Sequence, residues 1–335
     1  MTGQRTSSVW KLEKEFGIEN LADNIWQRFG PGTTITWTGN NNDAQIQSIG
    51  SKFWDVATYG NFSGTFTVNT KLDYTNIAYL LLAFESYSYN PSTGTHTFQK
   101  ADGKRVPSFT QQIKILDRMV SGQIDETIKL LGFVVSTIAF KQDTNTSGVV
   151  TVTLSGFYKW EQRLESELDV TDFQPFEGEL VEWLCLQIPP GNTVANVDKV
   201  SFGNSNNAKV QGSTCTRQAT DYYEQQSTFD FATTVYANNG LADFYERFYS
   251  GGYATGLTEP KKKNLKPIPA VRITSSYDDT STTFGAVIDI TNVVVKTNLR
   301  GADPGSKMTE APTFTSQKVV ISITTNIGSL QSLLS

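Results

Sequence analysis

Acidic residues beside tryptophans come closest to a catalytic arrangement in this chain. They lie in and before the segment PFEGELVEW: Trp160, Glu161, Glu177, Glu179, Glu182 and Trp183. Glycosidases need little more than two carboxylates and an aromatic platform. Acids spaced at i, i+2 and i+5 are nevertheless more typical of a solvated strand or loop, so the segment does not predict a catalytic pair.

The residues that metal, disulfide and nucleophilic catalytic sites require are scarce or missing in this sequence. The sequence has a single histidine, His96, and two cysteines, Cys185 and Cys215, with no CxxC motif. This count argues against a structural zinc site, a disulfide scaffold and a histidine-dependent triad. Phosphate-binding glycine loops and the GxSxG elbow are also missing. We therefore predict no catalytic, cofactor or metal site, and the sequence leaves open whether the cysteines pair.

Charge and hydropathy narrow the class of partner. The 28 Lys+Arg and 33 Asp+Glu give a formal net charge of −5, so the overall field would repel a polyanion. Apolar runs such as 78–84 are far shorter than the ~20 residues that span a bilayer. The start MTGQRTSSVW has no apolar signal-peptide core. We expect a soluble protein without a membrane partner and without tight nucleic-acid binding.

Period-two alternation of Val, Ile, Thr, Phe and Tyr predicts a mainly β protein. The clearest runs are 34–38, 64–70, 149–156, 228–235, 286–295 and 318–325. Helical spacing is limited to two segments, 73–85 and 238–249, with one or two helical turns expected within 9–27. The pattern predicts many strands with one short α-helix in each half.

The order of these elements recurs along the chain. A strand near 33–38, an Asn-rich turn, a strand at 62–70 and a helix are followed by the same series from 199 onward. At an offset of about 165 positions, Phe66 corresponds to Phe229 or Phe231, Leu80 to Phe244, and 130–138 to 286–294. The predicted organisation is an arm (1–32), a β-domain (33–161), an extended Pro-containing linker (162–196), a second β-domain (197–328) and a tail (329–335).

This order resembles that of the phage tail tube proteins, a family of viral tail (major tail) proteins. The resemblance lies in three passages: TITWTGNNN, FSGTFTVNT and NIAYLL between 34 and 81; SFT, KLLGFVVSTIAF and GVVTVTLSGF between 108 and 157; and the recurrence after 197, including GAVIDITNVV at 285–294. It spans nearly all of the chain except the arm and the extreme C-terminus. Family members typically carry one such domain and form hexameric rings, whereas this chain has two.

The resemblance implies a structural virion protein rather than an enzyme. Its fold would be two tandem tail-tube-like β-sandwich or barrel domains, each with one short α-helix. It would polymerise into stacked rings that form the tail tube, the conduit for viral genome ejection. The main partner would be the chain itself, with trimeric pseudo-sixfold rings favoured and a hexamer left open.

Further partners and the location also follow from the resemblance. Tape-measure, terminator and baseplate or tip proteins would contact the tube, and genomic DNA would pass through without specific binding. The protein would be assembled in the host cytoplasm and reside in the virion tail. If six domains each contribute four strands, the resulting barrel of 24 strands has a backbone diameter of roughly 48 Å.

Two groups of residues are candidates for roles in such a tube. Alternating strand positions suit a neutral-to-acidic lumen: Thr65, Thr67, Asn69, Thr151, Thr153 and Ser155. The cationic run around Lys261, Lys262 and Lys263 suits a contact with the next ring. Long loops at 40–61, 88–107 and 205–226 would reach that ring. Ordinary solvent-facing strands and a solvated basic loop remain alternative interpretations.

Three rival functions stay open at this point. The chain could form the tube of a related injection device. It could be a carbohydrate-binding β-sandwich surface protein that stacks sugars on Trp and Tyr. It could also be a hydrolase on a jelly-roll scaffold that uses Glu179 or Glu182, which turnover lost on substitution of these residues would reveal.

Overall fold

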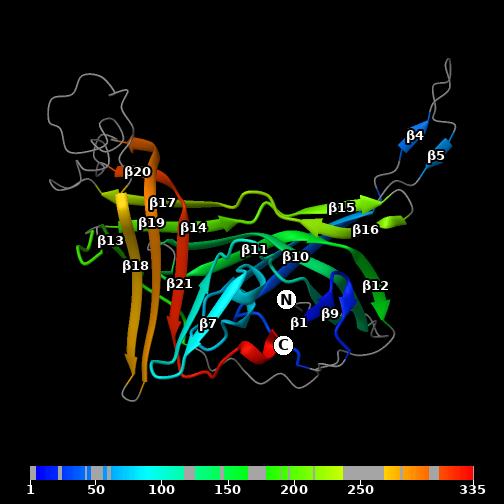
Figure 1. The fold of residues 1–335 in the computed structure, drawn as a ribbon, viewed down its shortest axis with the longest axis horizontal. Helices are drawn as coiled ribbons and strands as arrows, with labels where there is room; N and C mark the ends of the chain where they lie inside the picture. The colour runs from blue at the N-terminus through cyan, green and yellow to red at the C-terminus, as the bar shows by residue number, and fades with distance from the viewer. Residues whose placement is uncertain are drawn as a thin grey trace.

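The computed structural model shows a mainly antiparallel β protein (Figure 1). It describes residues 5–21, 25–41, 44–46, 56–58, 62–116, 125–143, 147–164, 179–188, 190–194, 197–213, 216–236, 268–279, 282–301 and 309–334. Within these ranges the helices are two short 3₁₀ turns, η1 (Ala78–Leu82) and η2 (Gln331–Leu333). The predicted β class is therefore confirmed, whereas one short α-helix in each half is not observed in the described ranges.

One long antiparallel sheet, here called the shared sheet, contains strands from both halves of the chain. In spatial order its strands are β3 (Thr34–Asn40), β6 (Ser63–Lys71), β11 (Thr151–Tyr158), β10 (Asp125–Asp143), β14 (Val197–Ser205), β17 (Thr228–Tyr236), β20 (Thr309–Ser316) and β19 (Thr282–Gly301). Its strands β10, β11, β14 and β17 run across the molecule in Figure 1.

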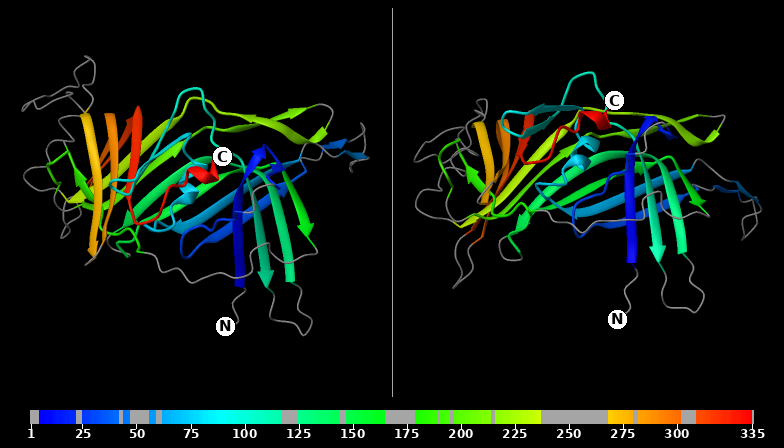
Figure 2. Two further views of the ribbon diagram at one scale, coloured as in Figure 1. Left: turned by 60° about the horizontal axis from the view of Figure 1, so that its bottom comes forward. Right: turned by 90° about the horizontal axis from the view of Figure 1, so that it is seen from below.

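Two flanking sheets continue from β10 and β19, which each belong to two sheets (Figure 2). The first contains β2 (Ile18–Glu19), β1 (Arg5–Glu15), β9 (Phe109–Leu116), the start of β10 and β12 (Trp160–Leu164). The second contains β13 (Cys185–Gln187), β18 (Ile268–Asp279), the start of β19, β21 (Lys318–Thr324), β8 (Thr95–Gln99) and β7 (Ser86–Asn90). In Figure 2 these two sheets stand at opposite ends of the molecule.

The same two local features bend β10 and β19: a residue with left-handed backbone and a β-bulge. Gly132 and Asn292 adopt left-handed backbone with φ of 69° and 54° at the point where each strand changes sheet. Each is followed by a bulge, between Val135 and Thr137 in β10 and between Val295 and Thr297 in β19. A bulge adds twist and redirects a strand, so one strand can serve two sheets.

Strand order and register repeat between the two halves. The order β3-β6-β11-β10 recurs as β14-β17-β20-β19. Phe66 lies opposite Gly156 and Phe231 opposite Phe314, so Phe66 corresponds to Phe231. Matching the bulges sets 130–138 against 290–298, which corrects the alignment to 286–294 that the sequence suggested, because apolar spacing alone does not locate a bulge. The expected match for Leu80, Phe244, lies outside the described residues.

The two halves are joined through backbone ladders. β10 pairs with β14 from Thr137↔Ser205 to Asp143↔Lys199, and β8 pairs with β21. One apolar cluster extends through both halves. The described part of the predicted linker contributes to it, since Val181, Leu184 and Leu186 are buried. The two halves thus share one core. The domain limits expected from the sequence stay a prediction.

Local expectations for helices are corrected at two places. The segment 73–85 forms only the five-residue η1, all of it buried, after a turn in which the Asp73 carboxylate accepts hydrogen bonds from the backbone N–H groups of Thr75 (2.7 Å) and Asn76 (3.2 Å). These bonds are those of a helix N-cap. The adjacent backbone is nevertheless held by strand-like bonds, from the Leu72 N–H to the Val150 carbonyl and from the Tyr74 N–H to the Glu179 carbonyl, and only a 3₁₀ turn follows. Within 9–27, β1 replaces the expected helical turns because it pairs with β9. The segment 238–249 lies outside the described residues.

Two of the expected long loops contain hairpins, and the first of these stands apart from the body of the molecule in Figure 1. β4 (Ala44–Ile46) pairs with β5 (Val56–Thr58), and β15 (Lys209–Ser213) pairs with β16 (Thr216–Tyr223). The third, 88–107, includes the β7–β8 hairpin. These segments are thus built elements, with backbone groups paired in ladders.

Candidate functional site: the polar face of the shared sheet

Side chains of the shared sheet alternate between an apolar face and a face of small polar residues, here called the polar face. In β6, Phe66 and Val68 are buried, whereas Thr65, Thr67 and Asn69 point to the other side and are half-buried or exposed. In β11 the same alternation buries Val152 and Leu154. Period-two geometry requires this separation.

All six residues predicted for a lumen lie together on the polar face. The ladder sets Thr65 opposite Phe157, Thr67 opposite Ser155, and Asn69 opposite Thr153. Thr153 donates its hydroxyl hydrogen to the Asn69 side-chain oxygen at 2.7 Å, and Thr151 lies one pair further along, opposite Lys71. Their grouping on one face follows from the alternation that the sequence displays.

A row of hydroxyl side chains crosses six neighbouring strands of this face. It consists of Thr36, Thr67, Ser155, Thr137, Ser205 and Thr228, each directly opposite the next. The Thr137 and Ser155 hydroxyls are 2.8 Å apart, and the matching pair in the second half, Thr297 and Thr313, is 2.5 Å apart. Only Thr67 and Ser155 of this row had been predicted. The other four residues join it through strand pairing: Thr36, Thr137, Ser205 and Thr228.

The next row has equally short side chains. It contains Thr34, Asn69, Thr153, Ala139, Gly203 and Asp230. Neither row includes an aromatic or long aliphatic side chain. The two rows therefore form a smooth, hydrated surface that passes from the first half of the chain to the second without interruption.

Charges on the polar face are mixed. Lys71, Lys141 and Lys199 lie on it with Asp143 and Asp230, and Lys199 Nζ is 2.9 Å from an Asp143 carboxylate oxygen. This pair joins β14 to β10. The three lysines outnumber the two aspartates by one, so the described part of the face is close to neutral and has no excess of acidic residues.

The acidic residues considered for catalysis take part in structural contacts, two of them through the main chain. The Glu179 carbonyl accepts a hydrogen bond from the Tyr74 N–H at 2.9 Å, and the Glu182 carbonyl accepts one from the Ser275 hydroxyl at 2.5 Å. The Glu161 carboxylate accepts the Tyr158 hydroxyl at 3.3 Å, which together with burial raises the pKa of Tyr158. Glu177, Lys261, Lys262, Lys263 and Cys215 lie outside the described residues.

His96 and Cys185 also occupy structural positions. His96 is fully buried in β8, with Nδ1 2.9 Å from the Tyr87 hydroxyl and Nε2 3.3 Å from the Ile327 carbonyl oxygen. Burial lowers the pKa of His96. Cys185 is a free, exposed thiol at the start of β13.

An asparagine network, unrecognised in the sequence, seals the junction between β10 and β14. Asn206 is fully buried, its backbone N–H donates to the Ser136 carbonyl at 2.7 Å, and its side-chain amide donates to the Val135 carbonyl at 3.0 Å. The Asn204 amide donates to the Asn206 side-chain oxygen at 2.7 Å, and Lys100 also contacts this oxygen. The Asn-rich stretch suggested only a turn, because burial of these side chains depends on the partner strand.

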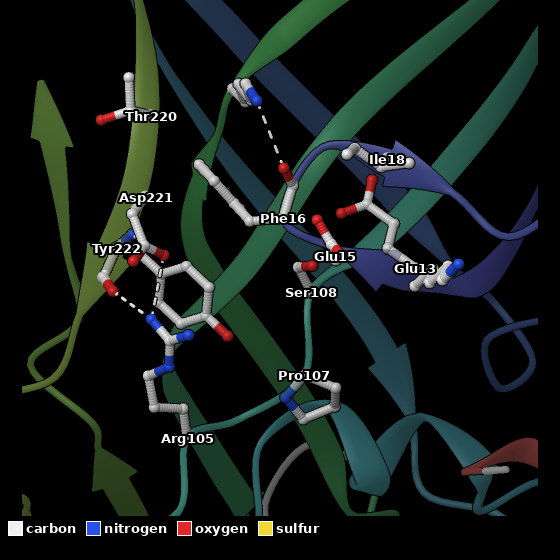
Figure 3. Close-up of a pocket in the computed structure, with 12 residues that line it drawn as sticks. Glu13, Glu15, Phe16, Ile18, Arg105, Pro107, Ser108, Thr220, Asp221 and Tyr222 are labelled. Atoms are coloured by element: carbon white, nitrogen blue, oxygen red, sulfur yellow. Dashed lines mark hydrogen bonds and ion pairs between the residues drawn. The ribbon is translucent and has the colours of Figure 1, made fainter. Parts of the chain in front are cut away.

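A cavity of about 630 Å³ lies between the β1–β2 turn and the β15–β16 hairpin (Figure 3). Arg105 binds Asp221 at 3.0 Å and the Tyr222 carbonyl at 2.7 Å across it. At its inner end, Glu13 accepts hydrogen bonds from the N–H groups of Gly17 (2.7 Å) and Gly132 (2.8 Å). Desolvation outweighs these bonds and raises the pKa of Glu13. The Arg105 contacts join the first half of the chain to the β15–β16 hairpin, so the cavity lies at the seam where this hairpin docks.

Scans of the chain against protein-family models and against curated proteins find no match. In the part of the chain that the structure describes, neither helix has the length and apolar character needed to cross a membrane. Within the same ranges, no group of three or more His, Cys, Asp or Glu side chains could hold a metal ion.

Proposed function

We propose that the chain assembles into rings that stack into a tube, and that this tube is the genome conduit of a viral tail. Three copies would form each ring, so that six repeats surround the channel. The carrying observation is the shared sheet, in which two equivalent sets of four strands are joined and two rows of small side chains cross six neighbouring strands.

The size of the channel supports this proposal. A closed barrel of 24 strands, about 4.8 Å apart and tilted about 40°, has a backbone diameter of roughly 48 Å. Short side chains, such as those of the hydroxyl row, narrow the bore little. A hydrated DNA duplex would still fit.

The chemistry of the polar face also suits passage rather than retention. A polyanion is held by cations that displace its counterions, and each such contact strengthens binding. The face offers hydroxyls and an amide. Its three lysines, Lys71, Lys141 and Lys199, are nearly balanced by Asp143 and Asp230, and Lys199 is paired with Asp143. DNA would therefore slide past a surface that hydrates it without binding it strongly.

Electron microscopy of the purified chain across a concentration series tests the proposal. We expect rings with three-fold symmetry and pseudo-sixfold density, stacked around an open axial channel. Monomers that persist at high concentration would overturn it, as would particles with a closed centre. A saturable sugar ligand on a glycan array, bound by such monomers, would instead favour the carbohydrate-binding alternative.

A further inference from the structure

The pairing of β10 with β14 shows within one chain how two repeats meet. The ladder runs from Thr137↔Ser205 to Asp143↔Lys199. Phe140 and Phe202 stack across it with ring centroids 4.7 Å apart and planes 12° apart. Backbone pairing, aromatic packing and an ion pair thus act together at this joint, here called the internal joint.

Each chain retains two strand edges that correspond to the two sides of the internal joint. β3 matches β14 in the repeat, and among the described residues its segment Thr34–Gly39 pairs with β6 alone. β19 matches β10, and its segment Thr297–Gly301 pairs with β20 alone within those residues. An open strand edge presents unpaired N–H and C=O groups to another strand.

We propose that β19 of one copy pairs with β3 of the next in the register of the internal joint. This inference rests on the proposed ring assembly and names its contact. Transferring the register sets Leu299 opposite Thr38 and Gly301 opposite Thr36 of the neighbouring copy. Each copy offers one edge of each kind, so the contact is head-to-tail and is satisfied for every copy only when the ring closes.

Asn41 supports the proposal because it corresponds to Asn206. Asn206 is fully buried at the internal joint and binds the backbone around the β10 bulge. Asn41 is exposed in the single chain, where its side-chain oxygen accepts a hydrogen bond from Arg217 at 3.0 Å. In the proposed joint, Asn41 would bind the Val295 and Lys296 carbonyls beside the matching bulge of the neighbour.

The two hairpins differ in the same way as Asn206 and Asn41: one packs against the other half of the chain and the other does not. β4–β5 and β15–β16 have matching registers, with Ala44↔Thr58 corresponding to Lys209↔Tyr223. β15–β16 rests on the first half, where the Tyr222 hydroxyl donates to the Val106 carbonyl at 2.5 Å. β4–β5 stands apart from the body of the molecule in Figure 1. Across the proposed joint it would rest on the second half of the next copy.

Disulfide cross-linking tests the joint and its register. In a full-length background with Cys185→Ser and Cys215→Ser, the test variant carries Thr38→Cys and Leu299→Cys. Directly opposite residues have Cβ atoms about 4.5–5.5 Å apart, close enough for a disulfide after small adjustments. Thr137→Cys with Ser205→Cys is the positive control, because these residues face each other within the chain.

A matched control isolates the register. Thr34→Cys with Leu299→Cys uses the same edges and the same face but shifts the pair by four residues, about 13 Å. After mild oxidation of the assembled protein, we expect the test variant to form intermolecular dimers and closed covalent trimers at least tenfold more than this control. Equal yields, or none in the test variant while the positive control oxidises, would overturn the proposed joint.

The outcome for the joint can be separated from that for the conduit. Tubes seen by electron microscopy without the predicted cross-link would refute the joint and leave the conduit proposal standing. Cross-linked trimers that never stack into an open tube would support the joint and refute the conduit. Free monomers that neither cross-link nor assemble would refute both.

Discussion

Asn206 and Asn41 offer a direct test, since they occupy equivalent positions with opposite burial. Asn206→Ala removes the side-chain hydrogen bonds to the Val135 and Ala83 carbonyls and those from the Asn204 amide and Lys100. A buried group left without a partner costs about 1–3 kcal/mol. The Asn204 amide keeps the Ala83 carbonyl at 3.5 Å, so we expect a total loss of about 3 kcal/mol rather than the upper limit.

The assay is urea unfolding of dilute, monomeric protein, followed by far-UV circular dichroism. Asn206→Ala should lower the unfolding midpoint with an unchanged slope. Asn41→Ala should change the free energy of unfolding by less than about 0.5 kcal/mol, because it loses only an exposed contact with Arg217. In sedimentation velocity at high concentration, however, Asn41→Ala should reduce ring formation.

Two results would refute this reasoning. Equal destabilisation of the monomer by both substitutions would show that the two sites are equivalent already in the single chain. Unimpaired ring assembly of Asn41→Ala would show that Asn41 does not repeat the role of Asn206. Either result would show that the contact between copies is not built like the internal joint.

Three further predictions concern other parts of the fold. Glu19 binds Lys11 at 2.7 Å and also Lys129. Burial opposes ionisation of Glu19, but these hydrogen bonds lower its pKa, so the stability that the ionised carboxylate contributes is present above pH 4.5 and is lost as pH falls through the lowered pKa. Glu19→Gln should therefore lower the free energy of unfolding by about 3 kcal/mol and flatten the acid limb of a Tm-versus-pH curve. An added Cβ at Gly156 would lie 1.9 Å from the Val134 carbonyl oxygen, so Gly156→Ala should lower the free energy of urea unfolding by about 3 kcal/mol, and a neutral result would contradict the observed packing. Thr67→Arg should leave tubes intact but make them retain duplex DNA at low salt and release it at high salt in a filter-binding assay, whereas salt-independent passage would argue against a polar-face lumen.

Much of the polar face could be predicted from local patterns. Alternation of Thr and Asn with Phe and Val in 64–70, and the same alternation in 149–156, separates the two faces, because successive strand residues point to opposite sides. The six candidate residues therefore share a face, as the structure shows. The recurrence of strands in matching order was also visible in the spacing of these runs.

Helix expectations failed where local spacing competed with tertiary pairing. Apolar residues in 9–27 fit helical turns, yet β1 is fixed as a strand by its ladder with β9. The run 78–82 fits a helix, but the structure forms only the 3₁₀ turn η1 there, with all five residues buried. Tertiary contacts outweigh intrinsic propensities of a few tenths of a kcal/mol per residue.

By itself, the sequence determined the strand class of this protein, the polar character of one face and the tandem order of its elements, since these depend on residues close together in the chain. Tertiary structure decided which edges meet, where β10 and β19 bend, and that Asn206 is buried while Asn41 is exposed. The reason is physical: register and burial arise from backbone pairing between distant segments, and a single bulge shifts which side chains face each other.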